Sequence, residues 1–183
     1  MIKIIKEDFD GRVLLISYLI HKDKRGHFFE GYKKAEFDKK VKKINFIQDN
    51  YSFSKHKYTI RGLHFQKKPF GQKKLINVLR GKIVDVVLDI NPKSKYFGCH
   101  KKYTLNSKDP YMLLVNDDFA HGFCTLENNT LVKYKVDKYY NKNKETTIFW
   151  NDKKLKINWP KINSKFITSI KDSSAKNFEK IKI

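Results

Sequence analysis

The chain has 183 residues, of which 40% are hydrophobic and 14% aromatic, a composition that can fill a buried core and is too apolar for a disordered chain. Basic residues number 40 against 19 acidic ones, giving a net charge of +21. Only four of the basic residues are arginines, and the lysines are spread along the whole sequence, so the charge favours a solvated lysine-rich surface over a nucleic-acid-binding stripe.

Short runs of β-branched and aromatic residues, separated by turn residues, predict strands along most of the chain. The expected strands are Arg12–Ile20, His27–Glu36, Ile44–Gln48, Thr59–Gln66, Lys74–Leu79, Lys82–Ile90, Lys101–Leu105, Tyr111–Val115, Gly122–Leu126, Thr130–Val136 and Thr146–Trp150. Helix is expected only around Lys33–Lys42 and in the tail after Pro160. So many short, evenly spaced strands predict an all-β sandwich or barrel with short peripheral helices, formed as a single domain over residues 1–183.

Two of the expected strands have faces that indicate how they sit in such a barrel. Successive residues of a strand point to opposite faces, so Lys82–Ile90 has one entirely apolar face and one face that carries Asp85 and Asp89. We expect the apolar face to meet the second sheet and the acidic face to line a polar cavity. In Thr130–Val136, Tyr134 shares a face with two valines, which predicts that its phenol points inward.

The sequence also bears on where the protein works. No apolar run approaches the length of a membrane span, and no hydrophobic signal segment follows Met1. The two cysteines, Cys99 and Cys124, fit no metal or redox spacing. We therefore expect a cytoplasmic protein with reduced thiols that does not associate with membranes.

Residues able to move protons are distributed along the predicted strands. The segment Arg61–Gln66 places His64 on a strand, and a histidine in that setting is more often structural than catalytic when it is alone. Downstream lie a lysine, two carboxylates, a second histidine and a tyrosine: Lys74, Asp85, His121, Tyr134 and Asp172. The set contains no nucleophile with a partnered base and no glycine-rich phosphate loop, so it favours acid–base chemistry.

A metal-dependent β-barrel enzyme is one alternative. Such a site would typically use a His-x-His pair, but the residue two positions after His64 is Gln66. His64, Gln66 and His121 make a poor ligand set for a catalytic divalent metal, so we expect no metal. A non-catalytic barrel that binds polyanions through its lysines is a further alternative.

Nine short motifs occur in one order along the chain. They are RGHFFE, QDNYSFS, RGLHFQ, GQKKL, VDVVLDI, FAHGF, VKYKVDKYY, FWND and INWP. Together they resemble the dTDP-4-dehydrorhamnose 3,5-epimerase family from about Leu15 to Asp172. The resemblance implies a cupin-type jelly-roll β-barrel, a homodimer, no cofactor, and epimerisation at C3 and C5 of a nucleotide-linked 4-keto-6-deoxyhexose. The family also contains enzymes that act at C3 only or on other nucleotide sugars, such as a GDP-heptose.

The resemblance also assigns roles to residues of this chain. It implies that His64 is the catalytic base, that Asp172 orients it, that Tyr134 is the acid and that Lys74 lies near the ketone. Supporting site residues are Asp85 and His121. The nucleotide and phosphate contacts are Arg25, Phe28, Glu30, Gln48, Asn50 and Arg61, with Arg25–Glu30 reaching the site of the partner subunit. The chain departs from the family at Asn91, where an arginine is common, and at Asn116–Asp118, which replaces a Pro-x-Gly turn.

The chemistry accounts for these residue types. C3 and C5 both lie next to the C4 ketone, so removing either proton gives an enolate and the ketone itself is the electron sink. A histidine suits proton removal near neutral pH, and a fixed cation such as Lys74 would stabilise the enolate oxygen. In a chain whose basic residues are mostly lysine, Arg25 and Arg61 are conspicuous, because a planar guanidinium suits a diphosphate better than an ammonium does. The alternative for Arg61 is a structural pairing with a core carboxylate.

Overall fold

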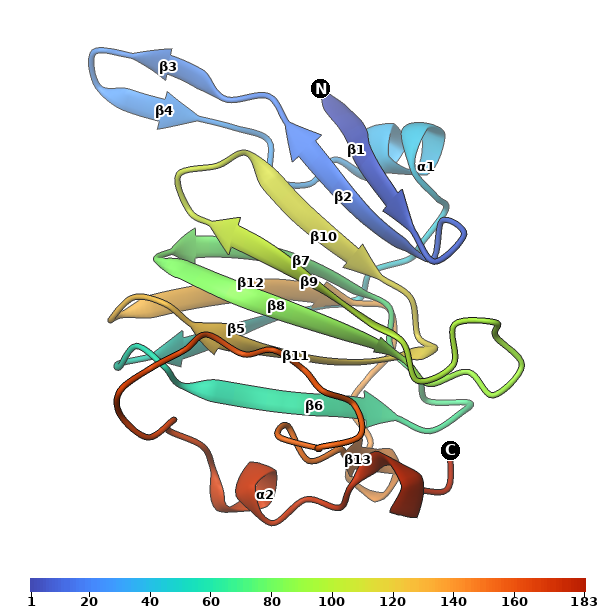
Figure 1. Ribbon diagram of the computed structural model, residues 1–183. Coiled ribbons are helices and arrows are strands. Elements are labelled where there is room, and N and C mark those ends of the chain that lie inside the picture. The colour runs from blue at the N-terminus through green and yellow to red at the C-terminus, as the bar shows by residue number, and fades with distance from the viewer.

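A computed structural model describes residues 1–183 and shows two facing antiparallel sheets (Figure 1). The six-stranded sheet has the order β1-β2-β10-β7-β12-β5, the five-stranded sheet has the order β13-β6-β11-β8-β9, and β3 and β4 form a separate hairpin. The strands are β1 (Ile2–Asp8), β2 (Val13–Tyr18), β3 (His21–Asp23), β4 (Gly26–Phe28), β5 (Gln48–Ser54), β6 (Ile60–Gln66), β7 (Lys74–Arg80), β8 (Lys82–Asp89), β9 (His100–Asn106), β10 (Tyr111–Val115), β11 (Phe119–Thr125), β12 (Thr130–Val136) and β13 (Glu145–Thr147). Strands that cross between two antiparallel sheets in this way form a jelly roll, so the predicted all-β, cupin-type fold is confirmed.

Helix is confined to short peripheral segments. These are α1 (Lys34–Lys40), α2 (Ile170–Ser173) and two 3₁₀ turns, Lys142–Lys144 and Phe178–Lys180. The prediction of a helix around Lys33–Lys42 is confirmed. The tail after Pro160 contains only the single turn of α2 and one 3₁₀ turn. Together with residues 148–160 it forms an irregular strap, residues 148–183, which follows β13 and runs below β6 (Figure 1).

Near the N-terminus one strand was missed and two strand predictions were wrong. Ile2–Asp8 is an edge strand that was not predicted, because its lysines and glutamate point to solvent and obscure the alternation. The strand expected at Ile44–Gln48 lies instead at Gln48–Ser54, where exposed and partly buried residues alternate. The strand expected at His27–Glu36 is reduced to the three exposed residues of β4, and α1 begins soon after it.

Hydrophobic residues form three layers, which explains why so many strands are apolar on both faces. The central layer lies between the sheets and includes Ile76, Val87 and Phe123. A second layer covers the outside of the six-stranded sheet under α1. The third fills the space between the five-stranded sheet and the strap that follows β13. Burial of this apolar area is the dominant favourable contribution to folding.

The third layer corrects the predicted orientation of β8. Its apolar face, which includes Val86 and Leu88, packs under the strap residues Leu155, Ile157 and Trp159 and not against the second sheet. The opposite face, which carries Asp85, is the one that looks into the barrel, where Val87 joins the central layer. None of the helices is long and apolar enough to cross a membrane.

Candidate active site

A pocket of about 450 Å³ opens between the two sheets. It is lined by charged and polar side chains from both sheets and from the strap, among them Arg61, His64, Lys74, His121, Tyr134, Lys171 and Asp172. A smaller cavity of about 150 Å³ adjoins it and shares His64, Lys74 and Tyr134 with it. The structure therefore brings together five of the six residues predicted to be catalytic or supporting, and the sixth, Asp85, lies just behind His121.

A bulge in β6 sets the direction of its polar side chains. His64 is paired with His121 of β11 and Arg61 with Phe123, so three steps on β6 match two on β11. The extra residue brings Arg61 and His64 to the same pocket, although strict alternation would place them on opposite faces. Gly62 makes this possible: its φ is +121°, and a Cβ there would lie 2.6 Å from the Cα of Gly122.

His64 and Asp172 form a hydrogen-bonded pair. The His64 Nε2 atom is 2.6 Å from Asp172 Oδ1, although the two residues are 108 positions apart. The carboxylate is almost fully buried, whereas the imidazole is 30% exposed and faces the pocket. Burial opposes ionisation of Asp172, but its hydrogen bonds, above all that with His64, outweigh this effect and lower its pKa. The pair thus presents one histidine nitrogen to the pocket and holds the other against a negative charge.

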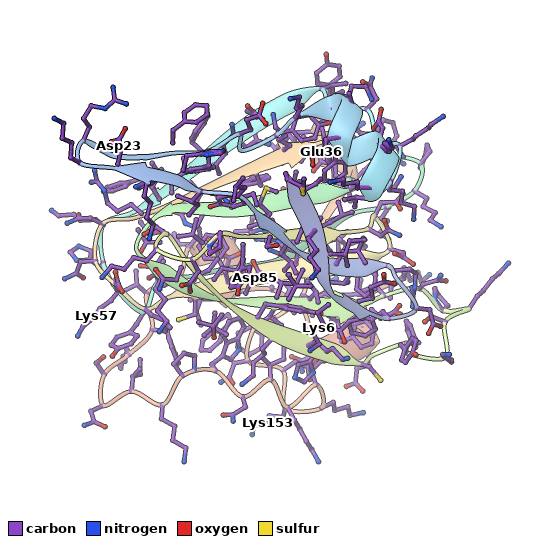
Figure 2. The ribbon with its side chains drawn as sticks, turned by 90° about the horizontal axis from the view of Figure 1, so that it is seen from above. Lys6, Asp23, Glu36, Lys57, Asp85 and Lys153 are labelled. Carbon is purple, nitrogen blue, oxygen red and sulfur yellow. The ribbon has the colours of Figure 1, made fainter.

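A second pair, His121 and Asp85, lies deeper in the barrel. His121 Nε2 is 2.7 Å from Asp85 Oδ2, and the Asp85 side chain is fully buried. Figure 2 shows Asp85 near the middle of the molecule, between the sheets. Burial lowers the pKa of His121 and outweighs the attraction of Asp85, and the nearby Lys74 and His64 lower it further. His121 is therefore neutral near pH 7, despite its acidic partner.

Lys74 and Tyr134 reach the pocket from the six-stranded sheet, opposite His64. Desolvation lowers the pKa of Lys74 to about 8, against the attraction of Asp85 and Glu145. Tyr134 lies between the buried Val132 and Val136 on the inner face of β12, as predicted, and packs against the central hydrophobic layer. Burial, with a smaller contribution from Glu145, raises the pKa of Tyr134, so the phenol keeps its proton and can act as an acid.

Arg61 forms no salt bridge with a carboxylate. Its Nε donates to Ser54 Oγ over 3.1 Å and its Nη2 donates to the Phe53 carbonyl over 2.8 Å, both neutral acceptors. The guanidinium is therefore held at the pocket wall with its charge unpaired, so it is available to bind an anion. This argues against the alternative that Arg61 pairs with a core carboxylate. Gln48 and Asn50 are hydrogen-bonded to each other over 2.7 Å on β5, and Asn50 is paired with Tyr134, so both lie beside the site.

Arg25, Phe28 and Glu30 do not join this pocket. Arg25 and Phe28 lie on the β3–β4 hairpin, which extends beyond the two sheets (Figure 1). Asp23, at the tip of the hairpin, is far from Asp85 in Figure 2. The Arg25 side chain is 84% exposed and contacts only the neighbouring Asp23, and Glu30 pairs with Lys33. Within one chain these residues have no contact with the site.

The sequence analysis missed two charged residues of the pocket. Glu145, the first residue of β13, accepts a hydrogen bond from Tyr140 over 2.6 Å and forms a salt bridge with Lys171. Lys171 immediately precedes Asp172 in α2, so the strap contributes both a cation and the carboxylate. Glu145 stands in a run of polar residues, NKNKET, that has no strand periodicity. Only its position beside the predicted strand Thr146–Trp150 could have indicated it.

Taken together, the jelly roll and its pocket are typical of an enzyme of the cupin type, with His64 and Tyr134 lining the pocket from two sheets. Histidine, cysteine and carboxylate side chains do not gather in a group of three or more that could hold a metal ion.

Residues 9–180 match the model of one protein family, dTDP-4-dehydrorhamnose 3,5-epimerase. The chain belongs to this family. The enzyme of that name from Shigella flexneri is 36% identical over 91% of both chains. The crystal structure of the Bacillus anthracis enzyme, with TDP and pyrophosphate bound, is 41% identical and superposes with a TM-score of 0.92 over 96% of this chain and 98% of that one. The Legionella pneumophila enzyme in complex with dTDP-4-keto-L-rhamnose is 32% identical and also gives a TM-score of 0.92, over 100% of this chain and 95% of that one.

Proposed function

We propose that this protein epimerises C3 and C5 of a 4-keto-6-deoxyhexose carried on thymidine diphosphate, to give dTDP-4-dehydrorhamnose. Its family membership supports the reaction and the substrate class. The observation that carries the proposal is geometric. His64 from the five-stranded sheet and Tyr134 from the six-stranded sheet line one pocket from opposite sides, with Lys74 beside Tyr134. Inversion at carbon needs a base on one face of the sugar ring and an acid on the other.

The residues divide the reaction between them. His64 removes the proton from C3, and a proton from solvent returns to the opposite face of that carbon. The imidazolium releases its proton to solvent, and His64 then removes the proton from C5, while Asp172 fixes the orientation of His64 and stabilises the imidazolium each time it forms. The electron pair moves onto the C4 ketone, so the proton transfers need no separate electron sink. Lys74 places its ammonium near the enolate oxygen, where a fixed charge lowers the energy of the transition state. Tyr134 delivers a proton to the opposite face at C5.

Arg61 is assigned to the diphosphate. Its guanidinium lines the pocket wall, is oriented by neutral acceptors and carries an unneutralised charge, which suits a bidentate contact with phosphate oxygens. Gln48 and Asn50 continue along the same side of the barrel and are assigned to the nucleoside. Relatives solved with TDP or with dTDP-4-keto-L-rhamnose support thymidine as the nucleoside.

Deuterium exchange tests the reaction directly. The purified protein is incubated with dTDP-4-keto-6-deoxyglucose in deuterated water, and incorporation at C3 and C5 is followed by NMR. The wild type should exchange and invert both carbons, whereas His64→Ala should lose exchange at both while retaining its circular dichroism spectrum. Exchange at C3 without inversion at C5 would identify a C3-only epimerase. No exchange with any 4-keto nucleotide sugar would refute the proposal.

We further propose that the protein is a homodimer in which Arg25, Phe28 and Glu30 serve the site of the partner. The outer face of the six-stranded sheet supports this, because Tyr51, Phe53 and Leu79 are 61%, 53% and 41% exposed there and adjoin an apolar groove. Exposed apolar patches of this kind mark association surfaces. Arg25 and Phe28 are largely exposed on the β3–β4 hairpin and do not line the pocket of their own chain, which leaves them available to a partner subunit.

Subunit complementation tests the shared site. Arg25→Ala and His64→Ala subunits carrying different tags are unfolded together, refolded and purified as mixed dimers. If Arg25 acts in the partner's site, one site of each mixed dimer contains both wild-type residues and activity returns. Mixed dimers without activity would refute the shared site. A monomer in sedimentation analysis would refute the dimer itself.

We place the enzyme in the cytoplasm. Cys99 and Cys124 are both free thiols, and a reducing compartment preserves free thiols. Burial raises the pKa of the Cys124 thiol to about 12, which keeps that residue unreactive in the core.

A further inference from the structure

The catalytic carboxylate is carried by a very small element. Asp172 lies in α2, a single helical turn of four residues in the strap, and it is the only buried residue of that turn. The preceding Ile170 is 87% exposed, so apolar burial does not hold the turn in place. An isolated turn this short is not stable by itself. Other contacts must therefore fix Asp172 against His64.

Ser169 provides such a contact at the N-cap of α2. Its backbone is extended (φ −73°, ψ 160°), and its Oγ accepts a hydrogen bond from the backbone N–H of Asp172 over 3.1 Å. This is the cap geometry that stabilises the first turn of a helix. Ser169, together with the Gly62 backbone N–H, also helps to lower the pKa of the Asp172 carboxyl group. Ser169 thus acts on both the backbone and the side chain of Asp172.

We propose that Ser169 is a positioning residue of this enzyme, which holds Asp172 in line with His64 through the cap of α2. The inference rests on the proposed function, in which the His64–Asp172 pair is the base. Ser173 and Ser174 lie in or directly after the same turn and are likewise exposed, but their hydroxyls donate to the Ile170 carbonyl over 3.0 and 2.7 Å. They have no contact with the pair and serve as matched controls.

Replacing Ser169, Ser173 or Ser174 with alanine removes no charged group from the surroundings of the His64–Asp172 pair. The titratable groups that line the pocket and its adjoining cavity beside Asp172 are Arg61, His64, Lys74, Asp117, His121, Tyr134, Tyr140, Glu145 and Lys171. None of them is hydrogen-bonded to Ser169. A change in the pH profile of a Ser169 variant therefore reports on the His64–Asp172 pair itself.

Steady-state kinetics of Ser169→Ala, Ser169→Thr, Ser173→Ala and Ser174→Ala test the inference. We expect Ser169→Ala to lower kcat by about tenfold, the factor that corresponds to one hydrogen bond to a charged group, with KM nearly unchanged. The acidic limb of kcat/KM, where the pair takes up a proton, should move to higher pH because a hydrogen bond to the charged carboxylate is lost. Threonine, which also caps helices, should restore both properties, and the two control variants should match the wild type.

A double-mutant cycle separates positioning from other roles. If Ser169 acts only through Asp172, adding Ser169→Ala to Asp172→Asn should cause no further loss of kcat. Additive losses, or a raised KM with normal kcat, would overturn the inference and place Ser169 in substrate binding. Wild-type kinetics of Ser169→Ala would overturn it as well. Because the wild type must first show exchange at C3 and C5, failure of the proposed function is recognised separately.

Discussion

In the proposed mechanism Lys74 stabilises the enolate, and its desolvated ammonium lowers the stability of the fold, so replacing it with methionine should show both effects. Its ammonium lies in the pocket between the sheets, and desolvation places its pKa at about 8 instead of 10.5. At about 1.4 kcal/mol per pH unit, this difference corresponds to about 3 kcal/mol of unfavourable free energy for the charged form in the folded state. Lys74→Met retains the length of the side chain and removes the charge, so it should stabilise the protein by up to about 3 kcal/mol at pH 7.

The pH dependence of this gain follows from proton linkage. Below pH 8 the lysine is protonated in both states, and the wild type bears the whole penalty. Between about pH 8 and 10.5 the unfolded chain binds more protons than the folded one, so the stability of the wild type rises with pH. The advantage of Lys74→Met should therefore be full at pH 7 and shrink steadily towards pH 10.

Urea unfolding of both proteins at several pH values from 7 to 10 measures this difference. Lys82→Met, which changes a partly exposed lysine at the start of β8 outside the pocket, is the matched control and should show no such trend. Deuterium exchange on the same samples should fall by about 10²–10³-fold in Lys74→Met, as when one stabilising group of an oxyanion site is removed. A variant less stable than the wild type at pH 7, or a difference that does not change with pH, would refute the reasoning.

Four further outcomes are expected. Asp172→Asn should lower kcat by at least about 10²-fold, because the imidazole loses its orienting charge, and a wild-type rate would rule out the pair. Tyr134→Phe should keep deuterium entry at C3 while inversion at C5 falls much further, and equal losses at both carbons would assign Tyr134 to substrate positioning. Gly62→Ala should destabilise the protein by about 2–4 kcal/mol in urea unfolding, since its Cβ would meet Gly122 at 2.6 Å and φ is positive; a change below about 0.5 kcal/mol would contradict the bulge argument. In the wild type, kcat/KM should decrease above about pH 8 as Lys74 loses its proton, and Lys74→Arg should move this decrease to higher pH if the cation is what matters.

The sequence predicted the fold class and the central strands because their signals are local. Tyr111–Val115 and Thr130–Val136 were predicted with the bounds that the structure shows, since each is a run of strand-forming residues between clear turn signals. The inward direction of Tyr134 followed from simple alternation. The edges of the sheets were harder. β1 carries exposed lysines, and the inner face of β5 is polar, with Gln48, Asn50 and Ser52. The strand character of both depends on pairing with β2 and β12, which a local pattern does not reveal.

The site was predictable in its residue types and only partly in its geometry. Proton-transfer groups can be recognised from sequence, and the family resemblance gave them an order. The shared direction of Arg61 and His64, however, depends on the bulge at Gly62, and the orientation of β8 depends on the strap that covers its apolar face. Glu145 and Lys171 were missed because they meet only when the strap folds back onto β13. These contacts join segments far apart in the chain, so no periodicity in the sequence indicates them.

The two histidine–aspartate pairs lie in different environments, although their hydrogen bonds are nearly equal in length. His64 is 30% exposed to the pocket, whereas His121 is 9% exposed and has its pKa lowered by burial. His121 is therefore suited to remain neutral and to donate or accept a hydrogen bond, while His64 is suited to exchange protons with a substrate. Asp85 is fully buried and its Oδ1 has no hydrogen-bond partner, but its charge raises the pKa of Lys74 against desolvation. Without Asp85 the lysine would lose its proton closer to neutral pH, so in the proposed mechanism the deep carboxylate keeps Lys74 charged.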